Sequence, residues 1–236
     1  MNKSIKGSQL VRCLSELSVS DVQVTHNKFA EKLGNLVDLS GSIALSQALK
    51  NLSSRTLSGA DQTADVLQSD FLDQRMALIQ SINKNFSSGT GFLLFRAQKN
   101  KLSSDVTEAV KYQVYQRFYL SQQNTLGSKV HALHSHVRDA IVGHSPKLMS
   151  LAALDRAMSD CLSEQTRKSF SVVPSLLAKR FNFLQTESMT ANWLDTFQHE
   201  MQQVLLAELE VRLQPVIGLI EALNQETQEV DIQTHD

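Results

Sequence analysis

Hydrophobic residues recur at every third or fourth position along most of this chain, which is the spacing of helices that bury one face. The longest regular stripe predicts a helix from about Met189 to Leu223, and its steps average 3.6 residues. Further apolar positions widen this face, so we expect the helix to pack inside a bundle, with a bend at Pro215. The stripe consists of Leu194, Phe197, Met201, Leu205, Leu209, Leu213, Val216, Ile220 and Leu223.

A second stripe predicts one helix of about 38 residues from Ser104 to Ile141. The next helix is expected to begin with Ser145 as its N-cap and Pro146 in its first position. Pro174 should divide the apolar segment that follows into two helices, because proline removes a backbone donor. The second stripe consists, with a break at Gln122, of Tyr112, Tyr115, Tyr119, Leu126, Val130, Leu133, Val137 and Ile141.

The first 52 residues predict three short helices, whose apolar faces begin at Leu10, Phe29 and Ile43. Residues 53–65 are rich in Ser, Thr, Asp and Gly and form a predicted linker, and the helix after them should end near Ser87 to Gly91. We therefore predict a short-helix subdomain with its linker (residues 1–60), a long-helix bundle (61–224) and an acidic, disordered tail (225–236). The helix before Ser87 should bury Val66, Leu67, Phe71, Met76, Ile79 and Ile82.

Composition supports a helical fold. Three prolines and nine glycines in 236 residues are too few turn-forming residues for a sandwich or barrel of many short strands. The predicted fold is therefore all-α, with an N-terminal cluster of short helices followed by a bundle of long antiparallel helices.

Two further features bear on the compartment. The two cysteines, Cys13 and Cys161, follow no secretory leader, so we expect buried, reduced thiols. The longest purely apolar run, Phe92 to Phe95, is four residues long, whereas a membrane-crossing helix needs about 20. The expected protein is cytoplasmic and has no direct membrane span.

Charge is distributed unevenly along the chain, although the formal net charge is only −1. Residues 1–186 carry 22 Lys and Arg against 14 Asp and Glu, a net charge of +8, whereas residues 187–236 carry one Arg against ten acidic residues, a net charge of −9. A cationic body of this kind can attract nucleic acid, an anionic membrane surface, an acidic protein or its own acidic segment. Either the last helix completes the core and its acidic end only solubilises it, or the acidic segment screens the body until a partner displaces it.

Basic residues between positions 96 and 180 are the candidate nucleic-acid site. Tyr112, Tyr115 and Tyr119 offer stacking surface for single strands, although their helical spacing favours a place in the core. A solvated helical face is the alternative interpretation of the cations. The candidate residues are Arg96, Lys99, Lys101, Lys111, Arg117, Lys129, Arg167, Lys168, Lys179 and Arg180.

The sequence contains no recognisable catalytic motif, and we assign no catalytic residue, metal ligand or cofactor. His131 and His134 would share a helical face and reach one metal, but their spacing is not that of a metalloprotease, and solvated histidines are the preferred interpretation. The glycines at positions 89 and 91 lack the Lys-Ser/Thr ending of a phosphate loop, so a turn before a buried segment is expected there.

Several stretches of the chain are similar to a known family. They are Leu10-Val11-Arg12 with Leu17 to Val22, Phe29 to Gly34, Arg117 to Leu120, His144-Ser145-Pro146 with Leu151 to Asp155, and Pro174 to Leu177 with Arg180-Phe181. Together they resemble a proteobacterial family of unknown molecular function that includes the ZorF-like component of type III Zorya anti-phage systems. The likeness covers most of residues 8–185 and includes no catalytic motif.

The resemblance implies a cytosolic accessory or effector protein in a defence system built around a membrane motor like a flagellar stator. Expected partners are other components of that motor-linked system, with DNA binding and homo-oligomerisation as open alternatives. Two other functions remain: a metal-dependent enzyme that uses His131 and His134, and a structural helical scaffold unrelated to defence.

Overall fold

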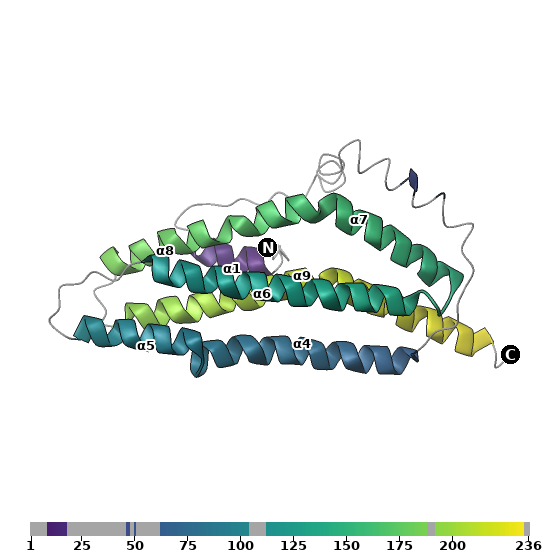
Figure 1. Cartoon of the computed structure of the whole chain (residues 1–236), viewed down its shortest axis with the longest axis horizontal. Helices are drawn as coiled ribbons and strands as arrows, with labels where there is room; N and C mark the ends of the chain where they lie inside the picture. Colours follow the sequence, from purple (N-terminus) through teal and green to yellow (C-terminus); the bar gives the residue numbers. More distant parts are fainter. Residues whose placement is uncertain are drawn as a thin grey trace, which may run out of the picture. The chain divides into compact units, whose positions relative to one another are not determined.

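Every secondary-structure element among the described residues is an α-helix, which confirms the predicted all-α class. The computed structural model describes residues 9–17, 46–47, 50, 62–103, 112–187 and 192–233. The elements are α1 (Gln9–Leu17), α4 (Ala64–Ser87), α5 (Thr90–Ser103), α6 (Tyr112–Ile141), α7 (Pro146–Ser171), α8 (Val173–Glu187) and α9 (Trp193–Gln233), as Figure 1 shows.

The helices contribute to two compact units. The first unit contains α1, α5, α8 and the parts of α4, α6 and α9 that lie within Met76–Ser128 and Phe170–Arg212. The second contains most of α7 and the parts of α4, α6 and α9 within Val24–Arg75, Lys129–Ser169 and Leu213–Asp236. Three long helices, α4, α6 and α9, therefore supply residues to both units.

Aromatic rings fill the core of the first unit. Phe95 of α5 lies 4.8 Å from Tyr115 of α6, and Phe181 of α8 lies 5.1 Å from Phe197 of α9, measured between ring centroids. Aromatic pairs in this distance range add stabilisation beyond their buried area. In the same unit α1 packs on α8, with Leu10 buried.

The core of the second unit is mainly aliphatic. The parts of α4, α6, α7 and α9 in this unit each contribute buried residues spaced by three or four positions, which is the pattern of a helix that buries one stripe. The buried side chains include Leu67 and Phe71 of α4, Leu133, Val137 and Ile141 of α6, Leu148, Met149 and Ala152 of α7, and Leu213, Val216, Leu219 and Leu223 of α9.

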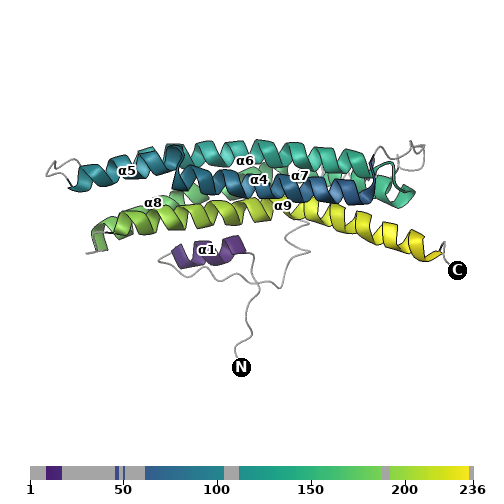
Figure 2. The same ribbon diagram turned by 90° about the horizontal axis from the view of Figure 1, so that it is seen from below.

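Predicted helix boundaries agree with the structure at three turns. The Ser145 hydroxyl accepts a hydrogen bond of 3.2 Å from the Leu148 amide, so Ser145 is the N-cap of α7. Val172 separates α7 from α8 and lies two residues before Pro174, which is the second residue of α8. Ser88 and Gly89 form the two-residue turn between α4 and α5. Figure 2 shows these two helices one after the other.

Other predictions need correction. Val66 and Met76 were expected in the buried face of α4, but they are about half exposed, because the buried stripe runs through Leu67, Phe71 and Leu78 instead. The last helix begins at Trp193 and continues through Pro215 to Gln233, so the predicted tail at 225–236 begins inside α9.

Some predictions fall outside the described residues. These are most of the second and third short helices, the linker before residue 62, and the start of the second long helix at 104–111. The predicted division at residue 60 therefore stays a prediction. Within the described part of the chain, no helix combines the length and apolar character that a membrane crossing requires.

Candidate functional site

The ten predicted nucleic-acid contacts fall into three groups. Lys111 and the side chains of Lys99 and Lys101 lie outside the described residues. Of the other seven, three form ion pairs and four do not. This division separates cations that the protein itself neutralises from cations that are open to a partner.

Three of the candidate cations are engaged by carboxylates. Arg167 and Lys168, at the end of α7, lie 2.8 and 3.5 Å from Glu164 oxygens. The hydrogen bonds from Arg167 are the main reason why the pKa of Glu164 is lowered. Arg180 donates two hydrogen bonds, of 2.9 and 2.6 Å, to Glu200 of α9, and these bonds raise the pKa of Arg180. Arg180 thus has a carboxylate of its own, whereas Arg167 and Lys168 share one.

Four candidate cations are exposed and form no ion pair within the part of the chain that the structure describes. They are Arg96 in α5, Arg117 and Lys129 in α6, and Lys179 in α8. Arg96, Arg117 and Lys179 belong to the first unit, and Lys129 belongs to the second. The first unit therefore presents free positive charge from three different helices.

The solvent-facing side of α6 in the first unit carries no acid. The sequence has no Asp or Glu between Glu108 and Asp139. Gln113, Ser121 and Asn124 are exposed on the same side of the helix as Arg117. These side chains can donate hydrogen bonds, and none of them competes for the guanidinium charge.

The α6 tyrosines belong to the core, as the helical spacing favoured. Tyr115 and Tyr119 are fully buried. The Tyr112 hydroxyl donates to the Pro174 carbonyl oxygen at 2.5 Å, and burial raises the pKa of Tyr112 to about 12. Tyr115 and Tyr119 therefore offer no open face for stacking a base, and the partly exposed Tyr112 ring packs beside the rings of Phe181 and Phe197.

A buried carboxylate, Glu208 of α9, forms the centre of a polar layer in the first unit. Its side chain is fully buried and accepts hydrogen bonds from the Tyr119 hydroxyl at 3.0 Å and from Gln123 Nε2 at 2.8 Å. Arg212 Nη2 lies 3.8 Å from the second carboxylate oxygen, and its guanidinium carbon lies 3.8 Å from the centre of the Phe170 ring. The layer thus connects α6, the end of α7, and α9.

The geometry of this layer favours an ionised carboxylate, although burial raises the pKa of Glu208 and lowers that of Arg212. Gln123 Nε2 also donates to the Phe170 carbonyl oxygen at 3.1 Å, and this second acceptor fixes which way the amide points. A proton on Glu208 would face donors from Gln123 and Arg212. We therefore interpret Glu208 and Arg212 as a buried ion pair that positions the helices.

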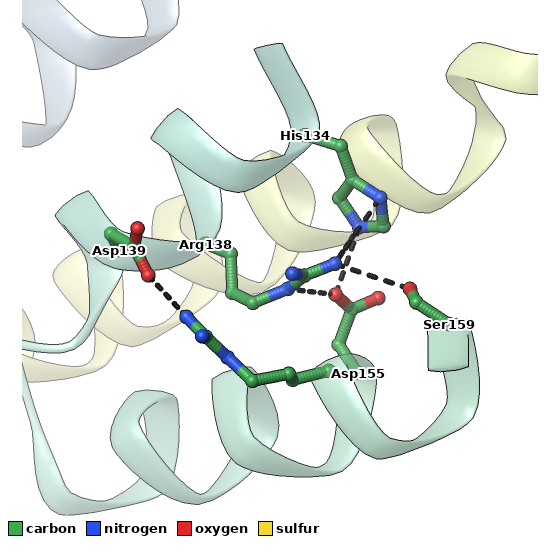
Figure 3. A network of polar contacts seen from close by, with 6 residues as sticks. His134, Arg138, Asp139, Asp155 and Ser159 are labelled. Carbon is green, nitrogen blue, oxygen red and sulfur yellow. Dashed lines mark hydrogen bonds and ion pairs between the residues drawn. The ribbon is translucent and has the colours of Figure 1, made fainter. Parts of the chain in front are cut away.

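A second polar layer joins α6 and α7 in the second unit, and Figure 3 shows it from close by. Asp155 Oδ2 lies 2.8 Å from His134 Nε2 and accepts a hydrogen bond of 2.6 Å from Arg138 Nε. Arg138 Nη2 also donates to the Ser159 hydroxyl at 3.1 Å. Burial alone would raise the pKa of Asp155, but the hydrogen bonds from His134 and Arg138 outweigh it and lower that pKa.

This layer corrects the interpretation of the histidines. His134 is buried and paired with Asp155, whereas it was expected on a solvated face; His131 and His136 are exposed. Asp155 contacts Nε2 of His134, and Arg138 Nη2 lies 3.4 Å from its Nδ1, so both ring nitrogens face other side chains. Among the described residues, no three His, Cys, Asp or Glu side chains lie close enough together to hold a metal ion.

The glycine pair between α4 and α5 serves packing. A Cβ atom at Gly91 would lie 2.5 Å from Phe118 Cζ and 2.7 Å from the Asn85 carbonyl oxygen. The predicted turn is present, but of the segment Phe92 to Phe95 that was expected to be buried, Phe95 alone is fully buried and Leu93 is exposed.

The acidic last segment completes the core. Phe197, Met201, Leu205 and Leu209 of α9 are fully buried in the first unit, as are Leu213, Val216 and Leu223 in the second. Glu200 pairs with Arg180, Glu208 with Arg212, and Glu226 with Lys147 at 3.2 Å. Part of the charge opposition along the sequence is therefore satisfied within the fold.

Glu208, Gln123, Arg138 and Asp155 are the polar residues that the sequence patterns did not single out. One signal was present: the break in the α6 stripe at Gln122 lies next to Gln123, which fills the gap in the buried face. Glu208 gives a weaker signal, as the charged residue directly before Leu209 in the apolar stripe of α9.

Comparison with known proteins gives a family and no function. A family model described as a protein of unknown function (DUF3348) matches residues 2–225, and the chain therefore belongs to this family. No curated protein and no solved structure matches the chain.

Proposed function

We propose that this member of the DUF3348 family is a non-enzymatic, cytoplasmic component of an anti-phage defence assembly linked to a membrane motor. In this role it binds partner proteins of the assembly and binds DNA through Arg96, Arg117 and Lys179. The resemblance of residues 8–185 to the ZorF-like family supports the place in a defence system. The free cations of the first unit support DNA as the anionic partner.

One observation carries the DNA-binding part of this proposal. Arg96, Arg117 and Lys179 stay exposed without an ion pair in the described residues, whereas Arg167 and Lys168 share the carboxylate of Glu164 and Arg180 pairs with Glu200. Each exposed cation that meets a phosphate releases condensed counterions, and this release supplies most of the affinity of non-specific DNA binding. We therefore assign the phosphate contacts to these three residues.

A matched pair of double variants tests this part. Arg117→Gln with Lys179→Gln removes two free charges, and Arg167→Gln with Lys168→Gln removes two charges that already have a carboxylate partner. Both variants change the net charge by the same amount. Fluorescence anisotropy with a labelled duplex at about 0.1 M salt should show an affinity loss of about tenfold or more for the first variant and a much smaller loss for the second.

Equal losses in the two double variants would contradict the assignment of the site, because only total charge would then matter. Absence of DNA binding by the wild-type protein would contradict the DNA-binding function itself. Circular dichroism of both variants controls for folding.

A plaque assay tests the defence role separately. Deletion of the gene from a strain that carries the whole defence system should abolish protection against phage, and re-expression of the wild-type gene should restore it. Full protection after deletion would contradict the role in defence and favour the scaffold interpretation.

A further inference from the structure

We propose that the DNA which this protein binds is double-stranded and is held through its phosphates, in preference to single strands. This inference rests on the proposed function and specifies its ligand. It follows from which side chains of the first unit are exposed and which are buried.

Binding of single strands without sequence preference depends on aromatic side chains that stack successive bases. The tyrosines of α6 are withdrawn from such a role. The Tyr112 ring lies 5.6 Å from the ring of Phe181 and 6.4 Å from that of Phe197, and its hydroxyl is bonded to the backbone of α8. Tyr115 and Tyr119 have no exposed surface.

Phe183 of α8 is the most exposed Phe, Tyr or Trp among the described residues, with 36% of its surface accessible. The guanidinium carbon of Arg180 lies 5.5 Å from the centre of its ring. Glu200 holds Arg180 in place with two hydrogen bonds, so the guanidinium lies over one ring face. One half-exposed ring does not make a track for consecutive bases.

Phosphate contacts, by contrast, need only distributed donors and positive charge. Arg96, Arg117 and Lys179 supply charge from α5, α6 and α8, and the exposed amides and hydroxyls beside Arg117 supply further donors. The acid-free outer side of α6 leaves no carboxylate to repel the backbone. A duplex offers the higher phosphate density, so a surface that lacks stacking platforms favours it electrostatically.

A competition experiment with the full-length protein separates the two forms. Wild-type protein bound to a labelled duplex is titrated with unlabelled duplex and, separately, with unlabelled single strands of equal length whose sequences do not fold. The duplex should displace the probe at a concentration about tenfold lower than the single strands. Phe183→Ala should leave both displacement curves unchanged.

Each outcome decides something different. Displacement by single strands at an equal or lower concentration would overturn the duplex preference while leaving DNA binding intact. A loss of single-strand affinity in the Phe183→Ala variant, with circular dichroism unchanged, would also overturn it, because a stacking platform would then exist. Failure of the labelled duplex to bind at all would overturn the proposed DNA-binding function and this inference with it.

Discussion

At the scale of single residues, the buried hydroxyls of α6 show how unequal two similar side chains can be. Tyr115 and Tyr119 are one helical turn apart and both are fully buried. The Tyr119 hydroxyl donates to Glu208, whereas the Tyr115 hydroxyl has no hydrogen-bond partner among the described residues. A buried polar group without a partner costs stability, and a hydrogen bond to a buried charge contributes to it.

Removal of these hydroxyls should therefore have opposite consequences. Tyr115→Phe is expected to leave the free energy of unfolding unchanged or raise it by about 1 kcal/mol, because no bond is lost. Tyr119→Phe is expected to lower it by about 2 kcal/mol, because Glu208 loses a donor. Urea unfolding followed by circular dichroism measures both. A larger loss in the Tyr115 variant would contradict the polar layer as described.

Two helical glycines provide a second contrast at this scale. At Gly218 in α9 an added Cβ would meet nothing within 4 Å, whereas at Gly91 it would meet Phe118 and the Asn85 carbonyl. Gly218→Ala should raise the free energy of unfolding by about 0.5–1 kcal/mol through helix propensity. Gly91→Ala should lower it by about 1–3 kcal/mol through overpacking. Thermal unfolding compares the two, and stabilisation by both would refute the tight packing at Gly91.

At the scale of elements, the first turn of α7 depends on one hydroxyl. Ser145 is buried, and its hydroxyl accepts a hydrogen bond from the Leu148 amide. Without this bond, that amide at the start of the helix would have no partner. Ser145→Ala should lower the free energy of unfolding by about 1 kcal/mol. Ser145→Asp should keep most of the wild-type stability, because Asp is also a good N-cap. Chemical denaturation checks this, and equal stability of the Ala and Asp variants would argue against the cap.

The pairing of α6 with α7 should make stability depend on pH. The folded pKa of Asp155 lies below its ordinary value, so the unfolded chain binds more protons between the two values. The contribution of Asp155 is therefore fully present above about pH 4 and is lost as the pH falls through the lowered folded pKa. Asp155→Asn should lower the free energy of unfolding by about 2 kcal/mol at pH 7, with a difference that shrinks below pH 4.

Urea unfolding of both proteins at several pH values tests this expectation. Asp139→Asn is a suitable control, because Asp139 pairs with Arg156 on the same two helices but both side chains are more than half exposed. Such an exposed pair contributes little. A difference between Asp155→Asn and wild type that stayed constant down to pH 2 would contradict the assigned role of the carboxylate.

Much at this scale followed from the sequence. Helical spacing predicted the α6 and α9 stripes, and Ser145, Pro146 and Pro174 marked the boundaries of α7 and α8, because caps and prolines act within one or two turns. The buried polar residues did not follow. Gln123 and Glu208 are 85 positions apart, so neither has a local signal that reveals its partner.

The sequence indicated which basic residues are candidates for a nucleic-acid site, but it did not show all the ion pairs that they form within the fold. Arg167 has a local signal for its ion pair, because Glu164 lies three positions before it, whereas Arg117 has no acidic residue within four positions. Arg180 and Glu200 come from different helices and are 20 positions apart, so the fold was needed to pair them.

At the scale of the whole molecule, the fold pairs some of the positive charges of residues 1–186 with acidic residues of 187–236 and leaves other positive charges unpaired among the described residues. The acidic segment is a core helix and supplies fully buried residues to both units, so it is not a detachable screen. Its ion pairs with Arg180 and Lys147 neutralise part of the cationic body. The cations of the first unit that remain free form the basis of the proposed interaction with DNA.

The most direct measurement is the salt dependence of duplex binding for the wild-type protein and the two double variants. We predict a linear fall of the logarithm of the binding constant with the logarithm of salt concentration. Its slope should become shallower by about 2 in Arg117→Gln with Lys179→Gln, one for each lost phosphate contact, and should change little in Arg167→Gln with Lys168→Gln. Identical slopes for all three proteins would contradict the account, since the free cations would then make no phosphate contacts.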